Sequence, residues 1–321
     1  MKTVVVNAND AGQRLDKLLT KTFRNLPVSL MYKGIRTKNI KLNGKRCEIS
    51  TRVCAGDVIT VYLKDDVLDE TPAAPDFMTA GKELSVLYED DNLLLLNKPA
   101  GLLVHPDENE YRDTLIFRVQ RYLFEKGEYD PQNENSFAPA LVNRIDRNTS
   151  GIVIAAKNAA ALRILNEKLK RREIHKYYLC IVHGTFTEKS ALLEGYLEKN
   201  ERQNRVYISD RGGVGARKIA TRYTVLDEND RYSLLEIELL TGRTHQIRAH
   251  LASIGHPLLG DGKYGTNALN KGTGFTRQAL CSYRLQFDFS TPADVLDYLN
   301  GQTFSLERVD FAEDFAAGKI C

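Results

Sequence analysis

One acidic side chain stands between two basic ones in the segment NRIDRNTSGIVIAA, residues 143–156. Asp146 has Arg144 two positions before it and Arg147 directly after it, and an apolar run typical of a buried strand begins at Ile152. A carboxylate in such a turn is most often part of a surface ion pair or a turn former. Kept ionised inside a ligand pocket, it could instead serve as a nucleophile or a base. The local pattern therefore leaves a structural and a catalytic interpretation open.

Two arginines further along the chain could keep such a carboxylate ionised, because a nearby guanidinium favours the charged form of an acid. They lie in GRTHQIRAHLASIGHP, residues 242–257. The spacing predicts a short helix with Thr244 as its N-cap and Gly255 as its stop. Arg243 would then stand at the helix N-terminus, where backbone donors and the helix dipole favour an anion. The alternative is a capped structural helix with an exposed arginine.

The sequence shows no pattern typical of a metal or nucleotide cofactor. His245, His250 and His256 lack an HExxH motif or a carboxylate cluster, so structural roles are favoured. The glycine cluster at 212–215 leads into a strand pattern rather than a helix, which argues against a phosphate loop. The five cysteines include no CxxC pair and indicate reduced, mostly structural thiols. We therefore expect no metal and no cofactor.

The region from residue 85 to 321 alternates short strand patterns with a few helices. Alternation of apolar residues with Glu236 and Glu238 indicates a sheet with one solvated face, and regular βαβ spacing is absent. Helices are predicted around residues 114–126 and 160–172. The predicted class is α+β, with a mixed, mostly antiparallel sheet. Residues 65–84 are acidic, contain two prolines and show no sustained period, which is typical of a linker.

The N-terminal segment carries most of the positive charge. Residues 1–46 contain eleven Lys or Arg against two acids, a net charge of +9, which leaves −6 for the rest because the whole chain carries +3. Two short basic helices are predicted within 12–23 and 29–40, followed by a tight turn at Asn43-Gly44 and a strand at 57–63. A solvated basic face is the alternative, but clustered cations of this excess favour a polyanion such as RNA. The expected RNA contacts are Arg14, Lys17, Lys33, Arg36, Lys38, Lys41 and Lys45.

The surroundings of the protein can also be inferred. The 321-residue chain is long enough for a large domain and a small one. The apolar run in the opening residues MKTVVVNAND is only three valines long, which is too short for a signal-peptide core. No run of about 18 apolar residues follows that could span a membrane. A cytoplasmic location and no membrane partner are expected. The absence of a heptad pattern favours a monomer.

Four motifs together resemble those of the RluA-type pseudouridine synthase family, most closely its branch acting on large-subunit ribosomal RNA. They are LLLLNKPAGLLVHP, NRIDRNTSG, EIHKYYLCIVHG and LLTGRTHQIRAHLASIGHPLLGDGKYG, at residues 93–106, 143–151, 173–184 and 239–265. The segments RLDKLL and KLNGKR in the N-terminal piece similarly resemble the S4 RNA-binding domain. The resemblance implies a cofactor-free isomerase with an S4-like domain at 1–64, a linker at 65–84 and a catalytic domain at 85–321.

The resemblance also implies roles for single residues. Asp146 matches the family aspartate, which acts either at C1′ as a nucleophile or at C2′ as a base. The resemblance implies that its arginine partner comes from the GRTHQIR motif, and we expect Arg243 to pair with Asp146 and Arg248 to be the second choice. Tyr178, in the Lys-x-Tyr motif, would lie against the uracil face, and Lys176 would touch phosphate. Arg144 would fill the space left by a flipped nucleotide; an ion pair with Asp146 is its alternative. A hydrolase would be expected to present two carboxylates of opposed pKa instead.

One position departs from the family pattern. The residue before Arg144 is usually histidine in this family, whereas Asn143 stands here. An amide can replace one hydrogen bond of imidazole but cannot titrate near neutrality, so a substrate contact at Asn143 is in question. The predicted partner is 23S ribosomal RNA. Transfer RNA, or a non-catalytic role in ribosome assembly, is the alternative. A metabolic glycosidase is disfavoured because it leaves the basic segment unexplained.

Overall fold

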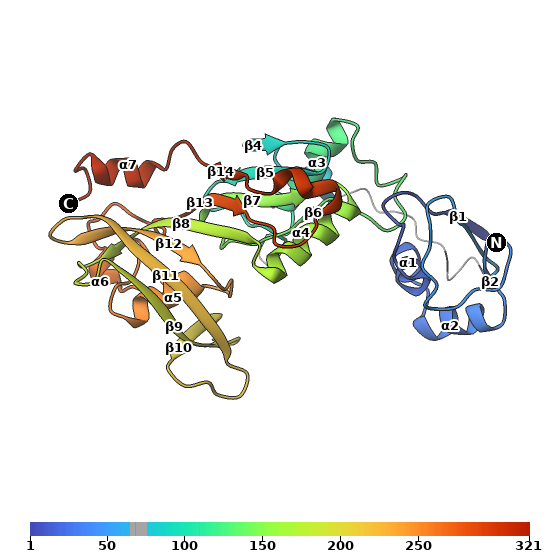
Figure 1. The fold of residues 1–321 in the computed structure, drawn as a ribbon, viewed down its shortest axis with the longest axis horizontal. Coiled ribbons are helices and arrows are strands. Elements are labelled where there is room, and N and C mark those ends of the chain that lie inside the picture. The colour runs from blue at the N-terminus through green and yellow to red at the C-terminus, as the bar shows by residue number, and fades with distance from the viewer. Residues whose placement is uncertain (65–67, 69–75, 109) are drawn as a thin grey trace.

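The computed structural model describes residues 1–64, 68, 76–108 and 110–321, and it consists of a small N-terminal lobe beside a larger sheet-based lobe (Figure 1). The small lobe contains β1 (Lys2–Val5), α1 (Leu15–Thr22), α2 (Val28–Arg36), β2 (Ile40–Leu42) and β3 (Val58–Val61). The larger lobe begins with η2 (Asp76–Thr79), β4 (Val86–Glu89), β5 (Leu93–Lys98), α3 (Leu115–Glu125), β6 (Ala140–Leu141), β7 (Ser150–Ala156) and α4 (Ala159–Arg171). It continues with β8 (Ile174–His183), β9 (Ser190–Asn200), β10 (Arg205–Ser209), β11 (Arg217–Glu228), β12 (Tyr232–Leu239), α5 (Gln246–Ser253), α6 (Asn267–Asn270), β13 (Leu280–Phe287), η3 (Asp294–Leu299), β14 (Thr303–Ser305) and α7 (Asp310–Ala316).

The small lobe packs two amphipathic helices on a three-stranded sheet. Its strands lie in the order β1-β3-β2, both pairs antiparallel. Leu15, Leu18 and Leu19 of α1 are fully buried against sheet residues, as the helical spacing predicts. Asn43 and Gly44 have φ of 51° and 72°, the left-handed pair that a tight turn requires. The two predicted helices, the turn and the following strand are therefore confirmed.

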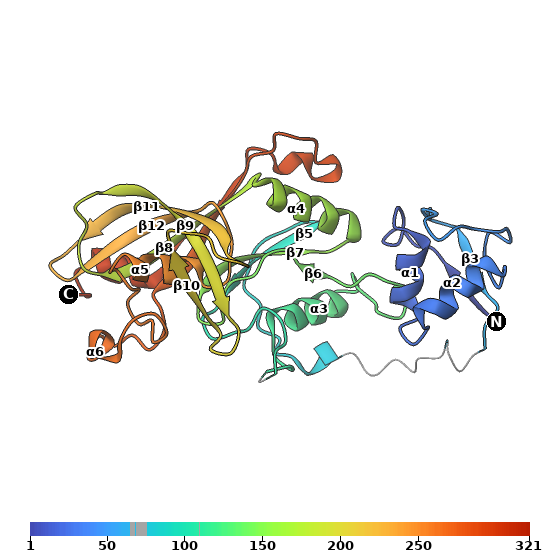
Figure 2. The same cartoon turned by 90° about the horizontal axis from the view of Figure 1, so that it is seen from below.

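The larger lobe is built on one eleven-stranded sheet. Nine strands follow the order β10-β9-β11-β12-β8-β13-β7-β5-β4, with β14 paired to β13 and β6 to β7. The pair β13–β7 is parallel and the other pairs are antiparallel, so the predicted α+β class with a mostly antiparallel sheet is confirmed. Helices α3 and α4 cover opposite faces of β5 and β7 (Figure 2). Within the described residues, no helix is long and apolar enough to cross a bilayer.

The parallel contact between β7 and β13 joins two half-sheets through only two residue pairs, Cys281 with Ser150 and Ser282 with Gly151. Gly151 has φ of 110°, and a Cβ added there would lie 2.1 Å from the carbonyl oxygen of Ser282. Only glycine therefore fits, because the two backbones approach too closely for any side chain. This narrow seam places the loop before β7 next to the strands of the other half-sheet.

Polar side chains connect the two lobes. Asp10 is fully buried and accepts hydrogen bonds from Asn135 and Ser136 of the larger lobe, while Asn9 donates to Glu134. Much of the predicted linker, 65–67 and 69–75, lies outside the described residues. Phe77 packs in the core of the larger lobe, so the last part of the predicted linker is structurally continuous with that lobe. The boundaries at 64 and 85 stay predictions.

Candidate active site

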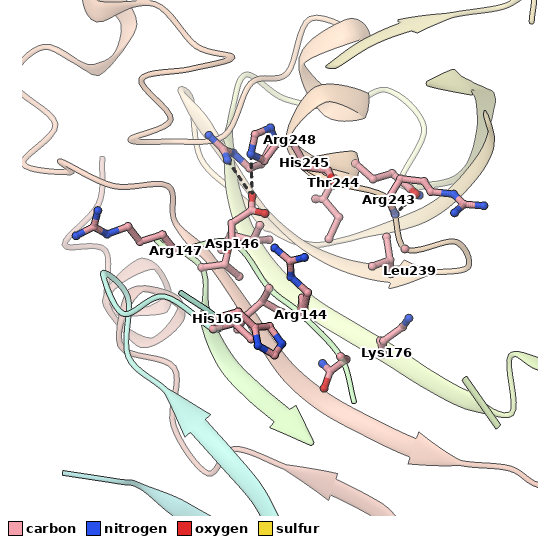
Figure 3. Close-up of a pocket in the computed structure, with 18 of the residues that line it drawn as sticks. His105, Arg144, Asp146, Arg147, Lys176, Leu239, Arg243, Thr244, His245 and Arg248 are labelled. Atoms are coloured by element: carbon pink, nitrogen blue, oxygen red, sulfur yellow. Dashed lines mark hydrogen bonds and ion pairs between the residues drawn. The ribbon is translucent and has the colours of Figure 1, made fainter. Parts of the chain in front are cut away.

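A cavity of about 800 Å³ opens at the seam between the half-sheets and contains the residues that the sequence singled out. Asp146 lies in its wall, in the loop between β6 and β7 (Figure 3). Tyr178 and Lys176 enter from β8, while Arg243 and Arg248 come from the segment that begins α5. Residues about 100 positions apart in the chain therefore share one cavity because the strand order brings β7 and β8 to either side of β13.

Arg248 holds Asp146 and is itself held by a second carboxylate. Its Nη1 donates to Oδ2 of Asp146 at 2.8 Å, while Nε and Nη2 donate to the two oxygens of Asp261 at 2.7 and 2.9 Å. Asp261 is fully buried, whereas the Asp146 side chain is 24% exposed and can reach a ligand. Because the bidentate pair fixes the guanidinium plane, Arg248 presents its remaining donor to Asp146 in one orientation.

The electrostatics of this pair of carboxylates follow from burial and charge. Burial disfavours the charged guanidinium, but its bonds to Asp261 and the charge of Asp146 leave the pKa of Arg248 raised above its ordinary value. Burial would likewise raise the pKa of Asp261, yet the bonds from Arg248 and from two backbone amides hold it below its ordinary value. Arg248 is therefore a permanent cation bonded to two carboxyl groups.

The predicted ranking of the two arginines is wrong. Arg243 forms no ion pair with Asp146 among the described residues, and its side chain points away from the carboxylate (Figure 3). Helix α5 begins one residue later than predicted, with His245 rather than Thr244 at the N-cap and φ of 53° there. Arg248 consequently lies on the inner face of the first helical turn, buried toward Asp146, while Arg243 stays exposed in the preceding loop.

A buried lysine, Lys98, is hydrogen-bonded to the backbone of the loop that carries Asp146. Nζ of Lys98 donates to the carbonyl oxygens of Pro99, Leu102 and Arg147, at 3.0, 2.8 and 2.9 Å. Burial lowers the pKa of Lys98 to about 7, and the charge of Asp146 opposes that shift. Arg147 itself donates to the carbonyl oxygen of Gly101 at 3.0 Å, which ties the same two loops together. The arginine after Asp146 therefore braces the backbone rather than the carboxylate.

The other predicted site residues differ in what they contact. Arg144 is exposed in the cavity wall and makes no ion pair with Asp146 among the described residues, which removes that alternative. The side chain of Asn143 is used by the neighbouring strand, where Oδ1 accepts from the amide of Ile154 at 2.8 Å. Tyr178 is buried in the cavity floor, and burial raises its pKa. Tyr177 faces the other way and stacks on Arg284.

The three histidines near α5 have separate surroundings. His245 lies 4.0 Å from Asp146 through Nε2, and its Nδ1 is 3.0 Å from the hydroxyl of Tyr264. Burial lowers the pKa of His245, while the charge of Asp146 opposes the shift. His250 contacts Thr221, and His256 stacks on Phe186. Within the described residues no group of three possible metal ligands is found.

Sequence reasoning missed three residues that organise the site: Asp261, Lys98 and Tyr264. Asp261 sits in LLGDGKYG, where an acid between two glycines is typical of a turn former. A signal was present in Lys98, because a lysine that ends the run LLLLN is placed where a charge must be buried and bonded. The ring of Tyr264 faces the Arg248 guanidinium, with 5.2 Å between the ring centre and Cζ. No local sequence pattern predicts this contact.

The small lobe displays its predicted RNA-contacting cations differently. Lys17, Lys33, Arg36, Lys38 and Lys45 are exposed, and their side chains have no partner among the described residues. Arg14 is paired with Asp16 at 2.9 Å, and Lys41 lies over the ring of Tyr62. The lobe thus offers a set of unpaired charges, whereas Asp146, Arg248 and Asp261 at the cavity are held in fixed pairs.

A basic lobe beside a cavity that contains an arginine-held carboxylate fits the class of RNA-modifying enzymes. The comparisons with known proteins narrow this class. Residues 92–253 match the model of the RNA pseudouridylate synthase family, and residues 13–59 match the S4 domain. The chain belongs to the RNA pseudouridylate synthase family, whose members are isomerases, and carries an S4 domain.

Similar proteins agree with this assignment. Ribosomal large subunit pseudouridine synthase C of Vibrio cholerae is 32% identical over 293 residues, 88% of this chain and 87% of the relative. The protein of the same name in Escherichia coli is 32% identical over 308 residues, covering 92% and 91% of the two chains. The solved structure of human RNA pseudouridylate synthase domain containing 1 shares the fold, with a TM-score of 0.52 at 24% identity over 77% of this chain and 98% of that one.

Proposed function

We propose that this pseudouridine synthase converts uridines of 23S ribosomal RNA to pseudouridine, with Asp146 as the reacting carboxylate and no cofactor. The observation that carries the proposal is the Asp146–Arg248–Asp261 arrangement at the cavity, with Asp146 the more exposed of the two acids. Support for the ribosomal substrate comes from the names of the relatives that are 32% identical. The cytoplasmic location and the monomeric state remain parts of the same proposal.

The reaction detaches uracil from C1′, turns it and joins it again through C5, so that no atom is gained or lost. Asp146 in its ionised form either attacks C1′ or removes the proton at C2′. Arg248 stabilises that ionised form without titrating itself, because its pKa is raised. Tyr178 provides an aromatic surface for the detached base, and its raised pKa keeps the phenol protonated near neutrality. The proton at C5 leaves to solvent after the new bond has formed, and N1, which has lost its bond to C1′, takes up a proton in its place, so the composition of the RNA is unchanged.

Arg144 is proposed to support the extruded nucleotide. It is exposed in the cavity wall, and its side chain is directed toward the region of Asp146 (Figure 3). A planar guanidinium can stack on a neighbouring base or bind a phosphate, which offsets the cost of unstacking, on the order of a few kcal/mol. The S4 domain supplies sequence-independent affinity through its exposed cations.

Tritium release tests the chemistry. A 23S ribosomal RNA transcript labelled with [5-³H]uridine should lose tritium to water when incubated with the protein. Substitution Asp146→Asn keeps the shape of the side chain but removes the ionised carboxylate, and release should fall by about 10³-fold or more. Release that persists in this variant would remove Asp146 from the mechanism.

Mapping pseudouridines tests the substrate. RNA from cells with and without the gene should differ at one or more positions of 23S ribosomal RNA, and purified protein should restore them in the deficient RNA. A difference confined to transfer RNA would replace the ribosomal assignment while leaving the chemistry in place.

A further inference from the structure

A second cavity of about 490 Å³ adjoins the active-site cavity. The two cavities share the side chains of Lys170, Lys176, Leu239 and Arg243, so they form one continuous hollow. We call the second one the flank cavity; its remaining wall comes from the end of α4, the start of β8 and the segment 238–242. A polymer with one unit at Asp146 would therefore have room for an adjacent unit here.

The flank cavity has an excess of unpaired positive charge. Lys170, Arg172, Lys176 and Arg243 line it, and none of these side chains has a hydrogen-bond or ion-pair partner among the described residues. Glu238 also lines the wall, but this acid is already bonded to Arg222 at 2.7 Å. Free cations around a hollow favour an anionic ligand, because each unpaired charge gains when the ligand neutralises it.

Lys176 is half-buried, whereas the other three cations of the flank cavity are exposed. Its ammonium group lies close to the backbone of Gly242, where an added Cβ would be 3.4 Å from Nζ. Burial lowers the pKa of Lys176, and no anion nearby opposes the shift. A partly buried cation without a counterion is costly unless a ligand supplies the counterion. An anionic ligand would supply the counterion that the Lys176 side chain lacks among the described residues.

We propose that the flank cavity binds a phosphodiester group of the nucleotide next to the target uridine, held by Lys176 with Arg172, Lys170 and Arg243. The proposal rests on the proposed function, since it places the next unit of the same RNA strand. His175 is the only ring in the wall among the described residues, which favours the sugar-phosphate backbone over a base. A base would be expected to meet a larger aromatic surface.

Two substitutions remove positive charge from the flank cavity and are compatible with the local backbone. Lys176→Met keeps the length of the stem and removes the charge. Arg172 has φ of 62°, and Arg172→Asn removes its charge with a residue that tolerates this left-handed conformation. Lys271→Gln is the matched control, because Lys271 is exposed and lines neither cavity. Thermal unfolding of each variant verifies that it is folded.

The measurement is equilibrium binding of an in vitro 23S ribosomal RNA transcript as a function of salt. The double variant Lys176→Met, Arg172→Asn should bind several-fold more weakly, and the slope of log K against log salt should become shallower by about 0.7 for each phosphate that the protein no longer neutralises. Lys271→Gln should match the wild type. An unchanged slope in the double variant, with or without weaker binding, overturns the proposal.

The same proteins separate this proposal from the proposed function. Tritium release at saturating RNA by the single variant Arg172→Asn should retain kcat to within a few-fold while KM rises, because Arg172 lines the flank cavity and not the cavity that contains Asp146. A wild-type protein that releases no tritium would overturn the proposed function, yet the binding comparison would still decide whether the flank cavity holds phosphate.

Discussion

In the S4 domain Lys17, Lys33, Arg36, Lys38 and Lys45 are exposed without side-chain partners among the described residues, whereas in the active-site cavity Arg248 is buried and bonded to two carboxylates. Both regions are rich in cations. They differ in whether each cation contributes to RNA binding or catalysis independently of its neighbours. Exposed charges act on RNA one by one, through a screened interaction that each can lose independently. A buried charge shared by two acids acts as one unit. We therefore expect many small effects in the first region and few large ones in the second.

The prediction with the most substitutions concerns the S4 domain. Substituting all five exposed cations by Gln should weaken binding of 23S ribosomal RNA by about 10²-fold or more at moderate salt, and flatten the salt slope by about 3.5 to 4.5. Turnover at saturating RNA should stay close to that of the wild type, because the cavity is unchanged. Salt-dependent binding and single-turnover tritium release measure the two quantities. Loss of turnover at saturation would show that the S4 domain also shapes the active site.

A single substitution at the active-site cavity should lower kcat by nearly as large a factor as the five S4-domain substitutions weaken RNA binding. Asp261→Asn keeps an oxygen for the backbone amides of Lys263 and Tyr264 but removes the anion that orients Arg248. A misplaced guanidinium should lower kcat by about 10²-fold, with a smaller change in KM. Kinetics on folded protein, checked by thermal unfolding, distinguish this from a general loss of structure. A change confined to KM would contradict the positioning role of Asp261.

A buried pair away from the cavity extends the comparison to stability. Lys168 and Glu173 are 2% and 6% exposed and bonded at 2.7 Å, and Ser290 also donates to Glu173. Burial opposes the ionised acid, but these bonds lower the pKa of Glu173 to about 2 from 4.5. Glu173 therefore takes up a proton at a lower pH in the folded state than in the unfolded state. Its contribution to the free energy of unfolding is complete above about pH 4.5 and is lost as the pH falls toward about 2.

Glu173→Gln tests that pair. The variant should lose about 2 kcal/mol of unfolding free energy at neutral pH, because Lys168 keeps a partner that carries no charge. Its stability should also fall less steeply than that of the wild type between pH 4.5 and 2. Urea unfolding across this pH range measures both. Parallel pH profiles for the two proteins would show that Glu173 does not titrate as inferred.

The smallest effect is expected from one exposed cation. Lys33→Gln should weaken RNA binding by only a few-fold and flatten the salt slope by about 0.7 to 0.9, as one phosphate contact would. Repeating the measurement at the other four positions tests whether the losses add. A single position that accounted for most of the effect of the five combined substitutions would remove the contrast between the two regions.

The sequence predicted most of the local structure because local patterns determine it. The turn at Asn43-Gly44 and the helix around residues 160–172 both depend on neighbouring residues, and both form as predicted. The choice between Arg243 and Arg248 depended instead on where α5 begins and on Asp261, which is 13 residues from Arg248. Nothing in the segment 242–257 contains that information. Local patterns therefore predicted the elements, while the ion-pair partners required the tertiary structure.

The two-pair contact at Gly151 has a consequence for how the enzyme can fail. Asp146 belongs to one half-sheet and Arg248 to the other, and the halves meet where no side chain fits. A methyl group at position 151 would displace the start of β7 from β13, and with it the loop that carries Asp146 from Arg248. Gly151→Ala should then yield a folded protein that still captures RNA and leaves its uridines unaltered.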